Sequence, residues 1–209
     1  MTAPTDSSVL AEVRHYYSER LQAHGPTPRG VDWNSGESQR LRFEQLLSLC
    51  TGARDFSLGD YGCGYGALLD HLTELGTPCR YLGYDIAEPM IHQARERHAH
   101  RPGAQFSCEE AILRSVDFLV ASGVFNVKLQ TPVEAWNGYV LRTLDRFARL
   151  SRGFAFNVLT SYSDPDRRRS DLYYADPCIL FDHCKRHYAR NVALLHDYGL
   201  YEFTLVVRP

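Results

Sequence analysis

The feature that most constrains this chain is a regular alternation of short apolar runs with segments of helical spacing. The apolar runs, which we expect to be strands, are 56–62, 80–86, 104–108, 116–127 and 153–162. The segments with helical spacing are 67–75, 89–99 and 132–151. Strands joined through helices predict a mostly parallel sheet with helices on both faces.

Two further segments complete this picture. Residues 117–125 are almost continuously apolar, as expected for a central parallel strand that is buried on both faces. The last segment, 191–209, contains two β-rich runs around a turn at 197–200, which indicates an antiparallel hairpin. We therefore predict an α/β fold, a doubly wound, seven-stranded and mostly parallel sheet with a C-terminal antiparallel hairpin.

The N-terminal segment indicates a helical extension. Leu10, Val13, Tyr17 and Leu21 form one apolar stripe of a helix over 7–23. We expect residues 1–30 to form a helical lid and residues 31–209 to form the ligand-binding domain. The N-terminus lacks a signal-peptide pattern, and no apolar run is long enough to span a bilayer, so we expect a cytoplasmic protein without a membrane partner.

Charge and cysteine usage give no sign of a polyanionic partner or a metal. The 23 Lys and Arg against 25 Asp and Glu leave a formal net charge of −2, which provides no general attraction to nucleic acid. The 6 cysteines include no C-x-x-C pair, and His183 and His187 have no matching acid, so no metal site is expected.

The strongest chemical signal is the sequence LGDYGCGYG at 58–66, where the first strand leads into a helix. Gly62, Gly64 and Gly66 allow a sharp turn and a close approach of the backbone to a ligand. Asp85 follows the second strand, where a carboxylate accepts hydrogen bonds from both hydroxyls of a ribose. A helix cap before Pro89 is an equally good interpretation of Asp85.

The glycine loop, Asp85-Ile86, residues 108–110 and residues 121–126 together resemble the Rossmann-like, class I S-adenosylmethionine-dependent methyltransferases. The resemblance covers residues 31–209 and implies S-adenosylmethionine as the cofactor. It implies that Asp60 and the three glycines lie near the methionine moiety and Asp85 on the ribose. For the remaining groups it implies Ile86 and Met90 against adenine, Glu109 or Glu110 near the adenine amine, and Ser122 and Gly123 in the cofactor site.

A narrower resemblance concerns residues 31–43, which are similar to a segment of a bacterial subgroup of small stand-alone methyltransferases. It implies that Arg42 pairs with the cofactor carboxylate, that Gln39 hydrogen-bonds to it and that Trp33 covers the sulfonium. The alternative is that Trp33 is a packing anchor and Arg42 an exposed helix charge.

The fourth strand is not followed by Asn/Asp-Pro-Pro-Tyr, the tetrapeptide of methyltransferases that act on nucleic-acid bases. With the near-neutral charge, this predicts a small-molecule acceptor, an amine or a hydroxyl, and no nucleic acid. A sulfonium is already activated, so alignment supplies most of the rate enhancement. Candidates for orienting or deprotonating the acceptor are Asn126, Tyr173, Tyr174 and Tyr16.

Three other functions compete with methyl transfer. If aromatic side chains seal the site, the cofactor's own amine can attack its γ-carbon and release methylthioadenosine and azetidine-2-carboxylate, as methyltransferase-like azetidine-2-carboxylate synthases do. A non-catalytic S-adenosylmethionine-binding subunit is the alternative of another class. A nicotinamide oxidoreductase ranks last, because the loop spacing and the terminal hairpin fit it poorly.

Overall fold

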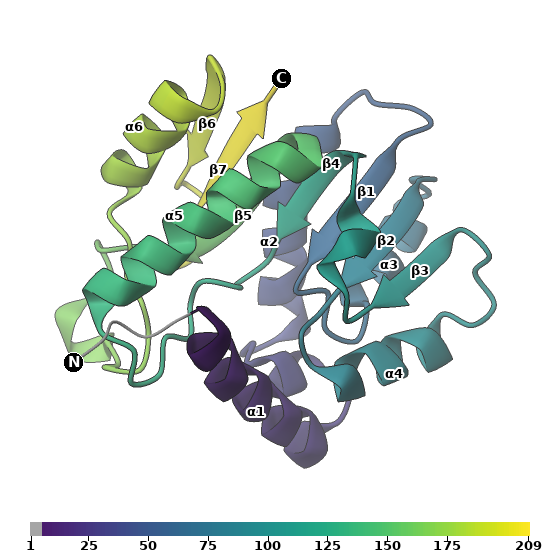
Figure 1. The fold of residues 1–209 in the computed structure, drawn as a ribbon, viewed down its shortest axis with the longest axis horizontal. Coiled ribbons are helices and arrows are strands. Elements are labelled where there is room, and N and C mark those ends of the chain that lie inside the picture. Colours follow the sequence, from purple (N-terminus) through teal and green to yellow (C-terminus); the bar gives the residue numbers. More distant parts are fainter. Residues whose placement is uncertain (1–5) are drawn as a thin grey trace.

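A single seven-stranded sheet forms the centre of the computed structural model, which describes residues 6–209 (Figure 1). The strand order is β3-β2-β1-β4-β5-β7-β6; the first five are parallel, and β7 is antiparallel to both of its neighbours. The strands are β1 (Ser57–Tyr61), β2 (Arg80–Tyr84), β3 (Ala104–Ser107), β4 (Val116–Ala121), β5 (Ser151–Leu159), β6 (Asn191–Leu195) and β7 (Glu202–Arg208). This topology confirms the predicted fold, including its terminal hairpin.

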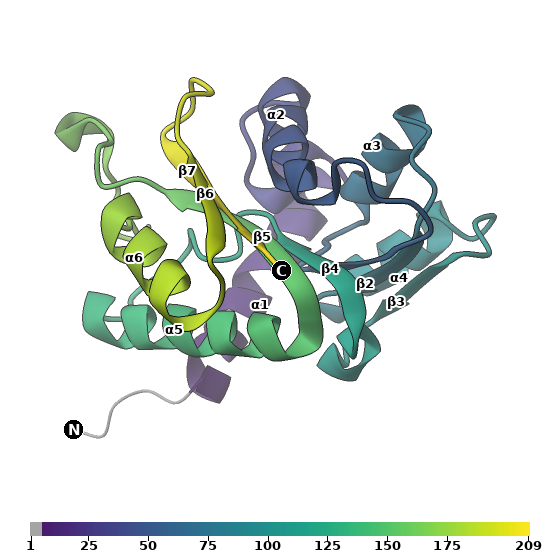
Figure 2. The same cartoon turned by 90° about the horizontal axis from the view of Figure 1, so that it is seen from above.

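Helices cover both faces of the sheet, and Figure 2 shows α2 and α3 on one side and α5 and α6 on the other. The α-helices of the described residues are α1 (Asp6–His24), α2 (Gly36–Leu47), α3 (Ala67–Glu74), α4 (Glu88–Arg97), α5 (Val133–Leu150) and α6 (Pro177–His187). Short 3-10 helices are η1 (Pro28–Val31), η2 (Ser48–Cys50), η3 (Glu110–Leu113) and η4 (Pro165–Arg167). None of the helices in 6–209 combines the length and the apolarity needed to cross a membrane.

Each face of the sheet has its own apolar core. On one face, Trp136, Leu144 and Phe147 of α5 pack in a cluster that also contains Leu180 of α6. On the other face, the cluster contains side chains of α2, α3 and α4 such as Leu46, Leu68 and Ile91. The central strand β1 is buried along its whole length, as required for a parallel sheet covered on both faces.

The helix α1 belongs to the main core instead of standing apart from it. Val9 and Val13 are buried in the same cluster as α5, and Leu21 packs with Ala87 and Met90. The helix ends where Gly25 takes a positive φ of 66°. Residues 1–5, which fall in the predicted lid, lie outside the described part of the chain, and the lid function of this segment stays a prediction.

The fourth strand is shorter than its apolar run suggests. The run 116–127 predicts one long strand, but β4 ends at Ala121 because Gly123 takes a positive φ of 70° and turns the chain. The apolar run continues past the turn because side chains there, Phe125 and Val127, are also buried. The resulting loop, 122–126, lies at the carboxyl end of the sheet.

The start of α6 provides a test of this local structure. The Asp176 carboxylate accepts hydrogen bonds from the backbone N–H groups of Cys178 and Ile179, at 2.8 and 3.1 Å. Replacing Asp176 by Ala should lower the free energy of unfolding by about 1 kcal/mol in urea titrations, since an N-cap is lost. Asp182→Ala, which removes only an exposed ion pair with Arg186 on the same helix, should have a much smaller effect. Equal effects would mean that the cap contributes nothing specific.

Candidate active site

The glycine loop between β1 and α3 can only be built from glycines. Gly62, Gly64 and Gly66 have φ values of +79°, +54° and +86°. A Cβ on Gly62 would lie 2.6 Å from Val124 Cγ2, and one on Gly66 would lie 2.7 Å from His98 Nε2. The loop is therefore held tightly between the end of the sheet and its neighbours, with its backbone close to the space above β1.

Asp85 ties this loop to α4. Its Oδ2 accepts the N–H of Gly64 at 2.9 Å, and its Oδ1 accepts the N–H of Ala87 at 2.8 Å. Burial raises the pKa of this carboxyl, while the two backbone hydrogen bonds lower it. The side chain also lines the pocket above the loop. Asp85 therefore bonds to the backbone at the start of α4 and contributes to the pocket wall at the same time. Its contact with a ribose stays a prediction.

That pocket, which we call the enclosed pocket, lies at the carboxyl ends of β1, β2 and β4. Its wall brings together most of the cofactor-binding residues expected from the sequence. These are Trp33, Gln39, Asp60, Gly62, Gly64, Asp85, Ile86, Met90, Ser122 and Gly123. The buried Gln39 accepts a hydrogen bond from the hydroxyl of Tyr65 at 3.4 Å. The Ser122 hydroxyl has no hydrogen-bond partner among residues 6–209.

Four expected cofactor residues lie outside this wall: Gly66, Glu109, Glu110 and Arg42. Gly66 stands behind the loop as the N-cap of α3. Glu109 is exposed, and the partly buried Glu110 pairs with Arg146 of α5 at 3.3 Å. The glutamates follow β3, the edge strand of the sheet, as expected. An adenine contact by either glutamate stays a prediction.

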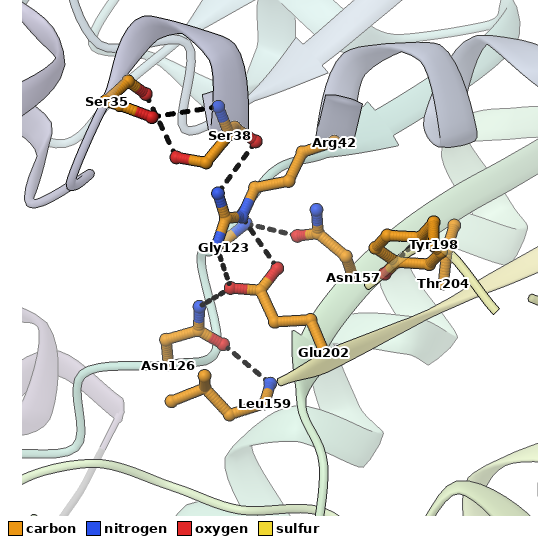
Figure 3. Close-up of polar contacts among 10 residues, drawn as sticks. All are labelled: Ser35, Ser38, Arg42, Gly123, Asn126, Asn157, Leu159, Tyr198, Glu202 and Thr204. Carbon is orange, nitrogen blue, oxygen red and sulfur yellow. Dashed lines mark hydrogen bonds and ion pairs between the residues drawn. The ribbon is translucent and has the colours of Figure 1, made fainter. Parts of the chain in front are cut away.

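Arg42 differs most from its expected role. Its Nε and Nη2 donate to the two carboxylate oxygens of Glu202, both at 2.8 Å, and its Nη1 donates to the carbonyl of Ser38 (Figure 3). Both charged side chains are almost fully buried, at 9% and 1% exposure. The guanidinium also lies 4.0 Å above the Trp33 ring. Its charge is thus compensated inside the protein, and it is not part of the enclosed pocket.

The same polar network fixes the loop 122–126. Asn126 donates from Nδ2 to Glu202 at 3.4 Å and accepts the N–H of Leu159 at 3.1 Å (Figure 3). At the other end of the loop, the Gly123 N–H donates to Asn157 Oδ1 at 2.6 Å. Because the buried Asn126 amide is bonded through both its nitrogen and its oxygen, Asn126 holds the loop in place. A catalytic role for it stays a prediction.

The tyrosines expected near the reaction centre occupy different environments. Tyr173 is buried in the apolar core, where burial raises the pKa of its phenol to about 12. It lines neither the enclosed pocket nor the second cavity, to which Tyr174 belongs. Tyr16 donates to Asp32 at 2.8 Å, and it is the neighbouring Tyr17 that enters the wall of the enclosed pocket. Tyr174 accepts the N–H of Arg169 at 3.0 Å and lines a second cavity.

This second cavity adjoins the enclosed pocket. The two share Tyr17, Val31, Trp33 and Gly123 as a common wall. A Cβ on Gly123 would lie 2.4 Å from Trp33 Cη2, so the indole lies directly against the backbone of the 122–126 loop. Asn126 and Glu202 also line the second cavity.

Several wall residues were not expected from the sequence. Tyr61 and Tyr84 end β1 and β2, while Trp136 and Tyr139 lie one turn apart on α5. Tyr61 and Tyr84 directly precede Gly62 and Asp85, so the predicted strand ends could have identified both tyrosines as neighbours of the site. Trp136 and Tyr139 follow ordinary core spacing, and nothing in the sequence separates them from packing residues.

The charge of the enclosed pocket is of one sign. Asp60 is buried there, accepts a hydrogen bond from Tyr81 at 2.5 Å, and has a pKa raised to about 7 by burial. Within residues 6–209, no lysine, arginine or histidine joins Asp60 and Asp85 in this wall. Such a wall favours a cationic ligand. The described part of the chain holds no group of three His, Cys, Asp or Glu placed to bind a metal ion.

The buried ion pair gives a direct test of the network. Glu202→Gln leaves the Arg42 guanidinium buried without a counter-ion, and should lower the free energy of unfolding by about 3 kcal/mol or more in urea titrations. The matched control is Glu74→Gln, which breaks an exposed pair between α3 and Arg40 of α2 at 2.7 Å and should change stability far less. Similar losses in both variants would contradict the importance of this pair.

Comparisons with known proteins agree with this geometry. Residues 60–150 match a family described as a methyltransferase domain. A protein of Mycobacterium tuberculosis, Rv1506c, whose name assigns it to the methyltransferases, is 51% identical over 163 residues, which cover 78% of this chain and 98% of that protein.

Solved structures show the same fold with different acceptors in their names. Magnesium protoporphyrin IX methyltransferase from Synechocystis PCC 6803, with bound S-adenosylmethionine, has a TM-score of 0.65 at 16% identity, over 100% of both chains. The small RNA methyltransferase HEN1 has a TM-score of 0.58 at 17% identity, over 81% of this chain and 25% of that chain. Taken with the mycobacterial relative and the matched domain, they lead to one conclusion: this chain belongs to the class I, Rossmann-like S-adenosylmethionine-dependent methyltransferases.

Proposed function

We propose that this enzyme transfers a methyl group from S-adenosylmethionine, bound in the enclosed pocket, to a small molecule bound in the second cavity. The observation that carries the proposal is the common wall of the two cavities, formed by Tyr17, Val31, Trp33 and Gly123. A methyl group can pass from one ligand to the other only where their sites meet, and this wall is that meeting point.

The enclosed pocket suits the cofactor in charge and in hydrogen-bonding groups. S-adenosylmethionine carries a net positive charge, and the wall contributes Asp60 and Asp85 without a basic side chain among the described residues. We assign Asp85 to the ribose, Ile86 and Met90 to the adenine, and Asp60, Gln39 and the glycine loop to the methionine moiety. The unpartnered hydroxyl of Ser122 provides a further hydrogen bond for that moiety.

The protein's part in catalysis is mainly positional. The bound cofactor supplies an activated methyl group on sulfur, so no strong nucleophile is needed from the chain. Trp33 and Tyr17 lie in the common wall, where aromatic faces can hold a sulfonium and exclude water. In the second cavity, Tyr174 and Asn126 are placed to orient the acceptor.

The helix α1 completes the site in this proposal. Leu10, Val13 and Tyr17 project from it into the wall of the enclosed pocket. Removal of α1 would open the pocket to solvent, which supports its assignment as a lid over residues 31–209. The empty volume of the second cavity, about 930 Å³, is in the range of small-molecule sites, which supports a small acceptor.

The acidic wall predicts a pH-dependent affinity for the cofactor. Below its pKa of about 7, Asp60 is protonated and neutral; above it, the carboxylate attracts the cation. The affinity for S-adenosylmethionine should therefore rise between pH 6 and 7.5, by up to about tenfold, and binding should release a proton. Calorimetry in buffers of different ionisation enthalpy measures both, and Asp60→Asn should remove the pH dependence. A pH-independent affinity in the unaltered enzyme would exclude this role of Asp60.

Product analysis tests the reaction itself. S-adenosylhomocysteine should accumulate when enzyme and S-adenosylmethionine are incubated with a small-molecule extract, and not without it, because the acceptor is a separate molecule. Liquid chromatography with mass spectrometry detects the product and the methylated compound. Methylthioadenosine formed from enzyme and cofactor alone would instead establish the cyclisation to azetidine-2-carboxylate. If the enzyme bound neither S-adenosylmethionine nor S-adenosylhomocysteine, both methyl transfer and cyclisation would be excluded.

A further inference from the structure

We propose that the acceptor is an uncharged molecule with several hydroxyl groups, such as a sugar, and that it is methylated on a hydroxyl oxygen. This inference rests on the proposed function, since it assigns a chemical class to the ligand of the second cavity. It is carried by the charges of that cavity, each of which already has a partner within the protein.

The side chains that line the second cavity include three arginines and two acids. Arg42 and Glu202 neutralise each other at 2.8 Å. Asp32 pairs with Arg20 at 2.7 Å, Arg169 with Asp171 at 2.5 Å, and Arg167 with Asp164 at 3.9 Å. A carboxylate or phosphate on the acceptor would have to compete with Asp164 or Asp171, and an ammonium would have to compete with Arg20 or Arg42. Displacing a partner in the buried pair of Arg42 and Glu202 leaves a charge without its counter-ion away from bulk water, which is strongly unfavourable. The pairs of Arg167 and Arg169 are more exposed, so the cost of displacing Asp164 or Asp171 is smaller, up to about 1 kcal/mol.

The same groups keep hydrogen-bonding capacity that a neutral ligand can use. Arg42 makes three hydrogen bonds of the five that a guanidinium can donate. The amide of Asn126 makes one long bond of 3.4 Å from Nδ2, and Asn34 and Ser163 also line the cavity. Hydroxyl groups both donate and accept, so they can bond to a paired guanidinium or an amide without disturbing its charge.

Aromatic side chains supply the rest of the wall. Trp33 lies under the Arg42 guanidinium at 4.0 Å, and Tyr174 under that of Arg168 at 5.4 Å, which fixes both rings. Tyr17 and Tyr201 also contribute to the cavity. Flat aromatic surfaces beside planar hydrogen-bonding groups suit a ring that has apolar C–H faces and a polar edge of hydroxyls.

The reaction on such an acceptor balances without another reagent. The hydroxyl oxygen forms a bond to the methyl carbon, the carbon–sulfur bond breaks, and its electron pair stays on sulfur as S-adenosylhomocysteine forms. The hydroxyl proton leaves to bulk water at the rim of the cavity, where Arg167 and Tyr201 are exposed. The products are a methyl ether, S-adenosylhomocysteine and a proton.

Three matched probes test the charge class. They are methyl α-D-glucopyranoside, its 6-carboxylate analogue and its 6-amino analogue, which differ only at carbon 6. Binding to the S-adenosylhomocysteine-loaded enzyme is measured by titration calorimetry or by ligand-observed NMR. The neutral glycoside should bind about fivefold or more tightly than either charged analogue, because only the charged ones disturb an ion pair.

A variant that breaks one pair should change this order. Asp171→Asn removes the counter-ion that bonds directly to Arg169 and leaves only Asp32 near it, so it should strengthen binding of the carboxylate probe by about fivefold or more while leaving the neutral probe unchanged. The control Asp182→Asn breaks a similar pair on α6, outside the cavity, and should leave all three affinities unchanged.

The outcomes separate this inference from the function on which it rests. Tightest binding of a charged probe to the unaltered enzyme would overturn the neutral class and leave a small-molecule methyltransferase in place. Binding of S-adenosylhomocysteine with no binding of any probe would overturn the sugar-like acceptor. Failure to bind S-adenosylhomocysteine would reject the proposed function itself.

Discussion

The buried ion pair between Arg42 and Glu202 is the interaction on which the shape of the site depends. It joins α2, near the start of the chain, to the first residue of β7, near its end. Asn126 bonds to the same carboxylate, and Trp33 stacks on the same guanidinium. A protein in which apolar side chains replace a buried ion pair is often as stable as the original, so the pair is not needed for stability alone. Its contribution here is geometric, because it fixes the loop 122–126 and the indole that both cavities share.

The sheet topology explains why these groups meet. The chain runs from β1 outward to β3, and then returns to β4 on the other side of β1, so the strand order reverses between β1 and β4. At such a point the loops that follow the two strands leave in opposite directions and open a crevice. The glycine loop follows β1 and the loop 122–126 follows β4, and the enclosed pocket lies between them.

The parts of the structure that could be predicted from the sequence are those set by local pattern. Alternation of apolar runs with helical spacing predicted the strands and helices, and the glycines and Asp85 were expected where the first two strands end. Arg42 was assigned differently because its partner, Glu202, lies 160 residues away along the chain. Tyr173 and Tyr174 are neighbours in one loop, and only the tertiary contacts decide that the first is in the core and the second in a cavity. Glu109 and Glu110 follow an edge strand, a position that depends on the order of strands in the sheet and not on their own segment.

The acidic wall of the enclosed pocket also bears on how turnover ends. Methyl transfer removes the positive charge from sulfur. In the proposed reaction, the carboxylates would therefore attract S-adenosylmethionine more strongly than S-adenosylhomocysteine. Uniform binding of both forms would leave the enzyme inhibited by its own product, whereas a wall of this sign distinguishes them by charge alone. Asp60 and Asp85 are the only charged members of this wall among the described residues, so the difference in charge between the two nucleotides would be felt mainly by these two carboxylates.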